Sequence, residues 1–287
     1  MAVKCLGIFR EITNSPNREN DDALILKAVT EELTKLGCET HLIEPENIHT
    51  VNPDEWDVVL PMCENYPALK TIDSWEWKPL LLNPPASVLN CYRSKMVPLI
   101  QQHCPELFPK TEMRYLKDLT AKPPKFWNEN GAWIKRGDVH NTCTHDVHFA
   151  GKWEDTKEVK RDFESREITG AVIQEHIPGD LIKFYGVGPM KWFDWFYHNP
   201  SQVAKYHFER KELEKCAAKV AEAVSLEIYG GDAIITPKGK IYIIDVNSWP
   251  SFARVRNEAR VHIARHAYAR ARSARGTKNN RQAQMED

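Results

Sequence analysis

The amino-acid sequence predicts an α/β protein in which a parallel, Rossmann-like layer precedes lobes of mixed α+β structure. In the first 90 residues, apolar strand-like segments alternate with an amphipathic helix, the pattern of a parallel sheet joined by helices. Beyond them come several strand-like segments, a long amphipathic helix and a hairpin. A chain of 287 residues is long enough for about two domain-sized units.

The first part of the chain contains three expected strands and one helix. Residues 3–9 form an apolar strand, and the helix begins after Asn20 and ends before Gly37. Two aspartates make the first turn of this helix acidic, and its apolar residues recur at helical spacing, which gives one buried face. Strands over 39–45 and 56–62 follow, so we expect them to form a parallel sheet.

The remainder of the chain begins at NPPASVLNCYRSK, whose prolines mark a boundary before a short helix from Ser94. Four strands are expected after it, at 132–137, 171–177, 181–188 and 190–198. A long amphipathic helix over roughly 209–226 leads into the hairpin GDAIITPKGKIYIIDVNSWP at 231–250. An Ala- and Arg-rich helix over 253–272 and a polar tail, expected to be disordered, end the chain.

Composition excludes several classes of protein. Hydrophobic residues make up 42% of the chain and charged residues 28%, as in ordinary globular proteins. No segment approaches the roughly 18 apolar residues of a membrane span, and the apolar part of MAVKCLGIFR is too short for a secretory signal. We therefore expect a cytoplasmic protein with no membrane partner. The seven cysteines include no CxxC pair, so we expect free thiols rather than a zinc site.

Two aspartates interrupt the apolar pattern of the hairpin. A turn at Lys238 and Gly239 places Asp232 opposite Asp245, with Asn247 on the same face. The same register pairs Ile234 with Ile243 and Thr236 with Ile241. Facing carboxylates repel by about 3 to 4 kcal/mol at an effective dielectric near 20, and three oxygen ligands suit Mg²⁺. The alternative is a slipped register, or a solvated hairpin end, that leaves two surface acids.

Basic residues are concentrated near the C-terminal end. Residues 253–282 hold nine Lys or Arg against one acid, Glu258, although the net charge of the whole chain is −1. Such a helix suits docking on nucleic acid or on an acidic partner, so a non-catalytic protein stays an alternative, either one that docks through this helix or a nucleotide-binding sensor. A docking module has no need of the metal-type hairpin, and we do not expect nucleic acid as the partner.

Five segments resemble motifs of the ATP-grasp superfamily, in which ATP binds between two lobes. DVNSWP is similar to the end of the family's metal-binding hairpin, and VIQEHIPGD is similar to the hinge strand whose backbone grips adenine. LIKFYGVG, AWIKRG and CYRSK resemble segments that carry phosphate-binding cations, and RGDVHNTCTHDV stands where the family has a lid. The resemblance covers about residues 90–255 and is nearest to the ligases of the ribosomal-protein glutamate ligase and glutathione synthetase type.

The resemblance implies roles for particular residues. It assigns Mg²⁺ to Asp232, Asp245 and Asn247, and catalytic contacts to Lys183 and Arg254. It assigns ATP binding to Lys95, Lys135, Gln174, Glu175, His176, Ile177, Asp180 and Lys183. The two lysines within strands fit this assignment because an unpaired ammonium is costly to bury.

The resemblance also implies a division of the chain and its assembly. A Rossmann-like domain over 1–90 precedes a small lobe over 91–172, a large lobe with the metal hairpin over 173–255, and a basic helix and tail over 256–287. Dimers through the first domain are common in the family, which leaves a homodimer open.

The activity that the resemblance implies is an ATP-dependent ligase. It would join a small-molecule carboxylate to an amine, or to a thiol, through an acyl phosphate. A kinase acting on a small polyol phosphate stays open, because Asp245 stands where many of the ligases have glutamate and the shorter acid occurs in the inositol phosphate kinase branch. Either acceptor would need cations, for which the available residues are Arg10, Arg18, Arg93, Arg254 and Arg256.

Overall fold

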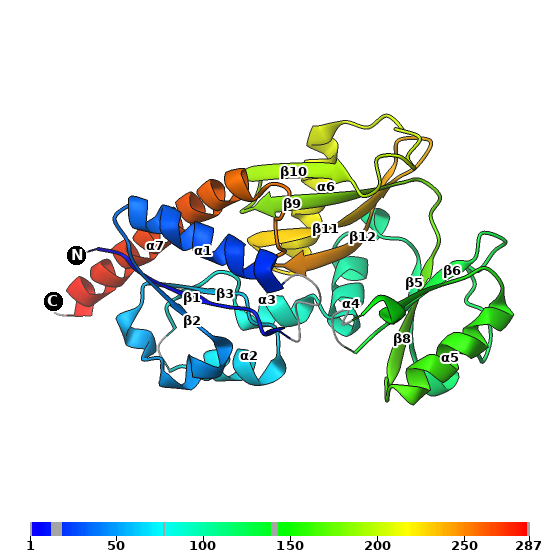
Figure 1. The fold of residues 1–287 in the computed structure, drawn as a ribbon, viewed down its shortest axis with the longest axis horizontal. Helices are drawn as coiled ribbons and strands as arrows, with labels where there is room; N and C mark the ends of the chain where they lie inside the picture. Colours follow the sequence, from blue (N-terminus) through cyan, green and yellow to red (C-terminus); the bar gives the residue numbers. More distant parts are fainter. Residues whose placement is uncertain (1, 13–18, 77, 139–142, 286–287) are drawn as a thin grey trace.

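The computed structural model describes residues 2–12, 19–76, 78–138 and 143–285. The strands of these residues form three four-stranded sheets. Figure 1 shows an elongated molecule in which the sheet that carries β5, β6 and β8 stands apart, at the right, from the rest of the protein. The mixture of parallel and antiparallel sheets covered by helices confirms the predicted α/β class.

The first sheet is parallel, with strand order β2-β1-β3-β4. Its strands are β1 (Lys4–Ile8), β2 (Glu39–Ile43), β3 (Val58–Pro61) and β4 (Leu80–Leu81). Two helices accompany it, α1 (Glu19–Lys35) and α2 (Tyr66–Asp73). Helix α1 buries the face that carries Ile25, Val29 and Leu33, as its helical spacing predicts, whereas Leu36 is exposed. Strand β4 is the one element of this sheet that the sequence pattern did not predict.

A second, antiparallel sheet has the order β5-β8-β6-β7 and forms the small lobe with helix α5 (Thr156–Ser165). Its strands are β5 (Thr111–Tyr115), β6 (Ala132–Arg136), β7 (Val147–Ala150) and β8 (Gly170–Glu175). Val159 and Phe163 of α5 belong to the apolar cluster on one face of this sheet. The sequence predicts β6 and β8 but not β5 and β7, which are short and partly exposed edge strands.

The third sheet is antiparallel, has the order β10-β9-β11-β12 and forms the large lobe. Its strands are β9 (Asp180–Val187), β10 (Trp192–Tyr197), β11 (Ile228–Ile235) and β12 (Ile241–Ser248). Helix α6 (Arg210–Ala223) buries Leu213, Ala217 and Val220 in the core of this lobe. Helices α3 (Pro85–Asn90) and α4 (Arg93–His103) link the parallel sheet to the small lobe. Short 3-10 turns lie at Pro45–Thr50, Pro53–Glu55, Pro105–Leu107, Leu116–Asp118, Thr144–Asp146 and Trp153–Asp155.

The C-terminal segment is one helix, α7 (Arg256–Met285), so the expectation of a disordered tail after residue 272 is wrong. Figure 1 shows α7 running beside α1. Four of its arginines form ion pairs with acids of other elements, namely Arg256 with Asp21, Arg260 with Glu32, Arg270 with Glu227 and Arg275 with Asp57. Much of the basic charge therefore fastens α7 to the protein and is not free for nucleic acid.

The parallel sheet is joined to the large lobe by buried hydrogen bonds. Asn83 is fully buried; its Nδ2 donates to the Ile228 carbonyl at 2.7 Å and to Ser248 Oγ at 2.9 Å. Trp249 Nε1 donates to the Leu82 carbonyl at 2.7 Å. Because these bonds end on β11 and just after β12, they fix the ends of the predicted hairpin against the first sheet.

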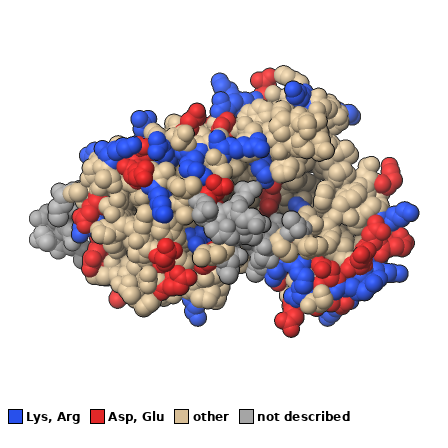
Figure 2. All heavy atoms as spheres, in the orientation of Figure 1, with Lys and Arg blue, Asp and Glu red and all other residues tan. Residues whose placement is uncertain are grey.

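The structure also bears on the cysteines and on membrane-spanning segments. All seven cysteines are free, and among them only Cys143 is exposed, which confirms the prediction of free thiols. In the described part of the chain, no helix is long and apolar enough to span a membrane. Figure 2 shows Lys/Arg and Asp/Glu side chains interspersed over the visible face, and a hollow between the small lobe and the rest of the molecule.

Candidate active site

A cavity of about 360 Å³ lies between the small and the large lobe, within the usual size range of small-molecule sites. The segment Gln174–Ile177, which leads from β8 towards β9, forms part of its wall. Its other polar lining residues are Arg93, Trp133, Lys135, Asp232 and Asp245. The cavity therefore brings together side chains from α4, β6, β8, β11 and β12.

Three charged residues form a row across the large-lobe sheet beside this cavity. Strand pairing places Lys183 of β9 opposite Asp232 of β11, and Asp232 opposite Asp245 of β12. Lys183 Nζ donates to Asp232 Oδ1 at 2.7 Å. The predicted pairing of the two aspartates is confirmed, and a lysine next to them offsets part of their repulsion.

Between this row and the turn, the predicted register of the hairpin is wrong. A β-bulge follows Asp232, so Ile234 pairs with Tyr242 and Ile235 with Ile241, one residue away from the predicted pairs. Ile244 has no partner in this register; it lines the cavity, and its carbonyl accepts a hydrogen bond from Lys135 Nζ at 3.2 Å. The bulge thus turns a backbone oxygen towards the small lobe, as bulges beside functional sites often do.

Lys135 is buried in the wall of the cavity that the small lobe supplies. Its Nζ also donates to Gln174 Oε1 at 2.7 Å. Burial and, to a smaller extent, the nearby Arg93 guanidinium lower the pKa of Lys135 to about 8, against the opposing effect of the Asp245 and Asp232 carboxylates. A lysine that is held by hydrogen bonds and has no direct ion pair with any described residue is suited to bind an anion that enters the cavity.

The depressed pKa of Lys135 gives a test of the ATP binding that the resemblance implies. If ATP phosphates contact the charged ammonium, raising the pH through about 8 removes that charge from the free protein, so ATP affinity should fall by up to tenfold per pH unit. Titration calorimetry of ATP from about pH 7 to about pH 10 measures the fall. A Lys135→Arg variant stays charged throughout and should bind ATP with little pH dependence; an equal fall in both proteins would contradict the assignment.

The α4 cation in the cavity is Arg93, not Lys95. The Arg93 side chain is 4% exposed, its Nη1 donates to the Arg136 carbonyl at 3.0 Å, and its Nη2 lies 3.7 Å from Asp245 Oδ2. Lys95 is exposed and does not line the cavity. The sequence pattern offers both residues within CYRSK, and only the packing of the first turn of α4 separates them.

The residues of the hinge segment differ in what their side chains do. Gln174 is buried between Lys135 and Thr111, to whose Oγ1 its Nε2 donates at 3.3 Å. The His176 ring lines the cavity; its Nδ1 accepts a hydrogen bond from Trp133 Nε1 at 3.0 Å, and burial lowers its pKa. Glu175 and Ile177 also line the cavity, as the resemblance implies.

Two other residues of the expected site lie outside the cavity. The Asp180 carboxylate is buried and accepts hydrogen bonds from the backbone amides of Ala204 and Tyr206, at 2.7 and 2.8 Å. It therefore holds a loop of the large lobe and does not line the cavity. Arg254 is exposed, and its guanidinium lies over the Phe196 ring, 4.4 Å from the ring centroid. Arg18, in the pool of acceptor cations, lies outside the described residues.

The acidic row fits a divalent cation. A smaller cavity of about 90 Å³ is lined by Lys183, Tyr185, Gly231, Asp232, Asn247 and Pro250. Asn247 Oδ1 is buried and has no hydrogen-bond partner in the described part of the chain. In the part of the chain that the structure describes, no group of three or more His, Cys, Asp or Glu side chains could hold a metal. The oxygen ligands available at the acidic row are therefore two carboxylates and one amide. Mg²⁺ is usually held by this few protein oxygens, with water and phosphate completing its shell.

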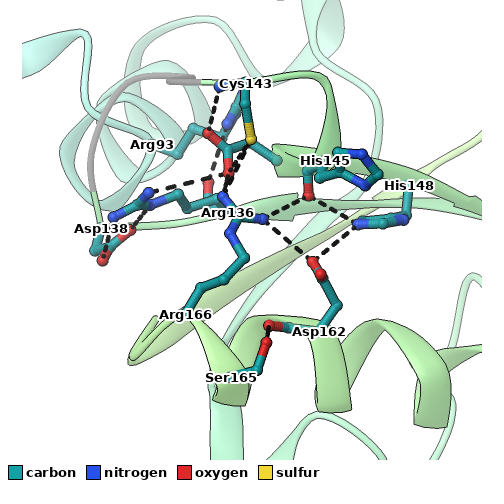
Figure 3. Close-up of polar contacts among 10 residues, drawn as sticks. Arg93, Arg136, Asp138, Cys143, His145, His148, Asp162, Ser165 and Arg166 are labelled. Atoms are coloured by element: carbon teal, nitrogen blue, oxygen red, sulfur yellow. Dashed lines mark hydrogen bonds and ion pairs between the residues drawn. The ribbon is translucent and has the colours of Figure 1, made fainter. Parts of the chain in front are cut away.

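A network of charged residues anchors both ends of the loop that stands in the place of the lid (Figure 3). At one end, Arg136 Nε donates to Asp138 Oδ1 at 2.6 Å. At the other end, Asp146 is fully buried, pairs with Arg166 and accepts from the Cys143 amide at 3.2 Å. Residues 139–142, the middle of this loop, lie outside the described residues. Arg93 donates to the Arg136 carbonyl and lies close to Asp245, so it connects this network to the acidic row.

The arrangement of two lobes with a cation-lined cavity between them is shared with solved structures of the ATP-grasp fold. The chain is similar to a RimK domain ATP-grasp protein from Sphaerobacter thermophilus, with 13% identity and a TM-score of 0.69 over 93% of this chain and 99% of the other. It is similar to the VanG D-Ala:D-Ser ligase from Enterococcus faecalis, with 14% identity and a TM-score of 0.68 over 94% and 100%.

The D-cycloserine synthetase DcsG has the same fold, with 11% identity and a TM-score of 0.64 over 93% of this chain and 99% of the other. No family model matches the sequence, and no curated protein matches it in a sequence search. At these identities the comparisons establish the fold, so the roles of individual residues depend on the geometry of the site.

Proposed function

We propose that the chain is an ATP-dependent ligase that joins a small-molecule carboxylate to an amine, or to a thiol, through an acyl phosphate. The observation that carries the proposal is the row Lys183, Asp232 and Asp245, whose two aspartates line the cavity between the lobes. Beside it lies the buried Asn247 oxygen, for which no hydrogen-bond partner is found among the described residues. The similar solved structures support it, because those named above include a D-Ala:D-Ser ligase and a D-cycloserine synthetase.

Different residues of the protein bind different parts of ATP. The backbone of the hinge segment Gln174–Ile177 meets the adenine edge, while Arg93 and Lys135 converge on the phosphates from α4 and β6. Lys183 contacts the phosphate that is transferred. Asp232, Asp245 and Asn247 would hold Mg²⁺, which neutralises phosphate charge when bound.

The proposed reaction has two steps. A carboxylate oxygen of the acid attacks the γ-phosphorus of ATP, and the bond to the β-phosphate oxygen breaks, which gives an acyl phosphate and ADP. The amine nitrogen then attacks the acyl carbon; phosphate leaves, and the nitrogen loses a proton to solvent. The cations around the cavity hold the reacting oxygens in line and offset the charge that develops on them.

Neither alternative activity gains support from a specific observation. The solved structures named above include ligases and no kinase, and four of the α7 arginines that would serve a docking helix form ion pairs within the protein. A homodimer and a cytoplasmic location remain part of the proposal.

Product analysis tests the ligase. The protein is incubated with Mg-ATP, a pool of small carboxylic acids and hydroxylamine as the nucleophile, and ADP, free phosphate and hydroxamate are followed together. A ligase gives acid-dependent ADP with equal amounts of phosphate and hydroxamate. ADP formed on a polyol pool without free phosphate would replace the ligase by a kinase, and absence of turnover with tight ATP binding would overturn both.

A further inference from the structure

Arg254 lies one strand beyond the row of charged residues. The chain leaves β12 at Ser248 and returns over the sheet, so that the Arg254 guanidinium covers the Phe196 ring of β10 at 4.4 Å. Phe196 is the direct cross-strand partner of Lys183. Adjacent strands are about 4.8 Å apart, so the order across the sheet is Phe196 with Arg254, then Lys183, then Asp232.

The charge of Arg254 is available to a ligand. Its neighbours in the chain are engaged, since Arg256 pairs with Asp21 at 2.6 Å and Arg260 with Glu32 at 3.6 Å. For Arg254 no ion pair to an acid is found among the residues that the structure describes. The Phe196 ring orders the guanidinium without neutralising it, because a cation–π contact leaves the N–H donors at the guanidinium edge free for a carboxylate.

Arg254 lies outside the small cavity of about 90 Å³ that carries the proposed Mg²⁺ site, because Lys183, Asp232 and Asn247 line that cavity and Arg254 does not. In the proposed reaction the reacting carboxylate meets the transferred phosphate at Lys183. Arg254, one strand away over the Phe196 ring, is therefore positioned for a second anionic group of the same molecule.

We infer that the acid substrate carries a second carboxylate, which binds the Arg254 guanidinium on the Phe196 ring. The inference rests on the proposed ligase activity and makes it more specific, because it selects dicarboxylic acids over monocarboxylic acids of the same length. Arg254 then binds the substrate at a distance from the reacting atoms, and Phe196 positions Arg254.

The hydroxamate assay tests this directly, because hydroxylamine brings no carboxylate of its own. Succinate, glutarate, adipate and pimelate are each compared with the monocarboxylate of equal chain length. At least one diacid should exceed its partner in kcat/KM by about tenfold to a hundredfold, and Arg254→Met should remove the difference while leaving the KM for ATP unchanged. Phe196→Leu should reduce it by about twofold to fivefold.

Arg272→Met is the matched control, since Arg272 is also an exposed arginine near an aromatic ring, at 5.8 Å from Tyr268, far along α7. It should leave the preference for diacids intact. Hydroxamate formation from mono- and dicarboxylates at equal rates, or an unchanged preference in Arg254→Met, overturns the inference and leaves the ligase standing. Absence of acid-dependent ADP with every acid overturns the ligase and the inference together.

Discussion

An Asp245→Asn variant should lose turnover by at least about a hundredfold while keeping its fold. The substitution preserves the shape of the side chain but removes one of two facing carboxylates, and the single carboxylate that remains, Asp232, is paired with Lys183 and binds Mg²⁺ far more weakly. Arg93, 3.7 Å from Asp245, still has its hydrogen bond to the Arg136 carbonyl, so the variant keeps a partner for the buried guanidinium.

Turnover against Mg²⁺ concentration, together with the melting temperature, measures the effect of Asp245→Asn. The rate should fall and the Mg²⁺ concentration for half-maximal rate should rise, whereas the melting temperature should change little. Asp194→Asn is the matched control, because Asp194 stands on the edge strand of the same sheet opposite Tyr185 and not opposite a second acid. Wild-type turnover in Asp245→Asn would contradict the assignment of the metal site to the acidic row.

The acidic row was predicted correctly because two one-residue shifts offset each other. The pairs nearer the turn, Ile234 with Tyr242 and Ile235 with Ile241, would place Asp232 opposite Ile244 in a regular hairpin, and the bulge returns Asp245 to that position. A period of two residues then puts Asp245 and Asn247 on one face. The bulge at Ile244 could not be predicted. One unpaired residue leaves the apolar composition of both strands unchanged, and its effect is visible only in the pairing and in the carbonyl that Lys135 binds.

The cations of the site were predicted less well, for a different physical reason. Lys135 and Lys183 stand within apolar strands, where a charge signals a function. On a helix, Arg93 and Lys95 both look like solvated residues, and their burial depends on which turn of α4 packs between the lobes. The position of Asp180 could not be predicted for a related reason. Its carboxylate accepts hydrogen bonds from a loop 24 to 26 residues away in the sequence, which the local pattern does not reveal.

Arg93→Met should weaken ATP binding by about tenfold to a hundredfold, whereas Lys95→Met should leave it unchanged. Both variants replace a cation by an unbranched apolar side chain on the same turn of α4. Only the first removes a guanidinium that lines the cavity, because Lys95 points to solvent. Titration calorimetry of ATP at one pH near neutrality gives both values, and equal losses in the two variants would contradict the assignment of Arg93.

Repeating the titration at several pH values separates a specific loss from general damage to the site. The Arg93 guanidinium lowers the pKa of Lys135, so its removal should raise that pKa above about 8 and move the fall in ATP affinity to higher pH. A loosened site would also admit water around Lys135, but Arg93→Lys keeps the charge and should keep the midpoint near that of the wild type. A midpoint that moves equally in the Met and Lys variants would mean that packing, and not the charge of Arg93, sets the pKa of Lys135.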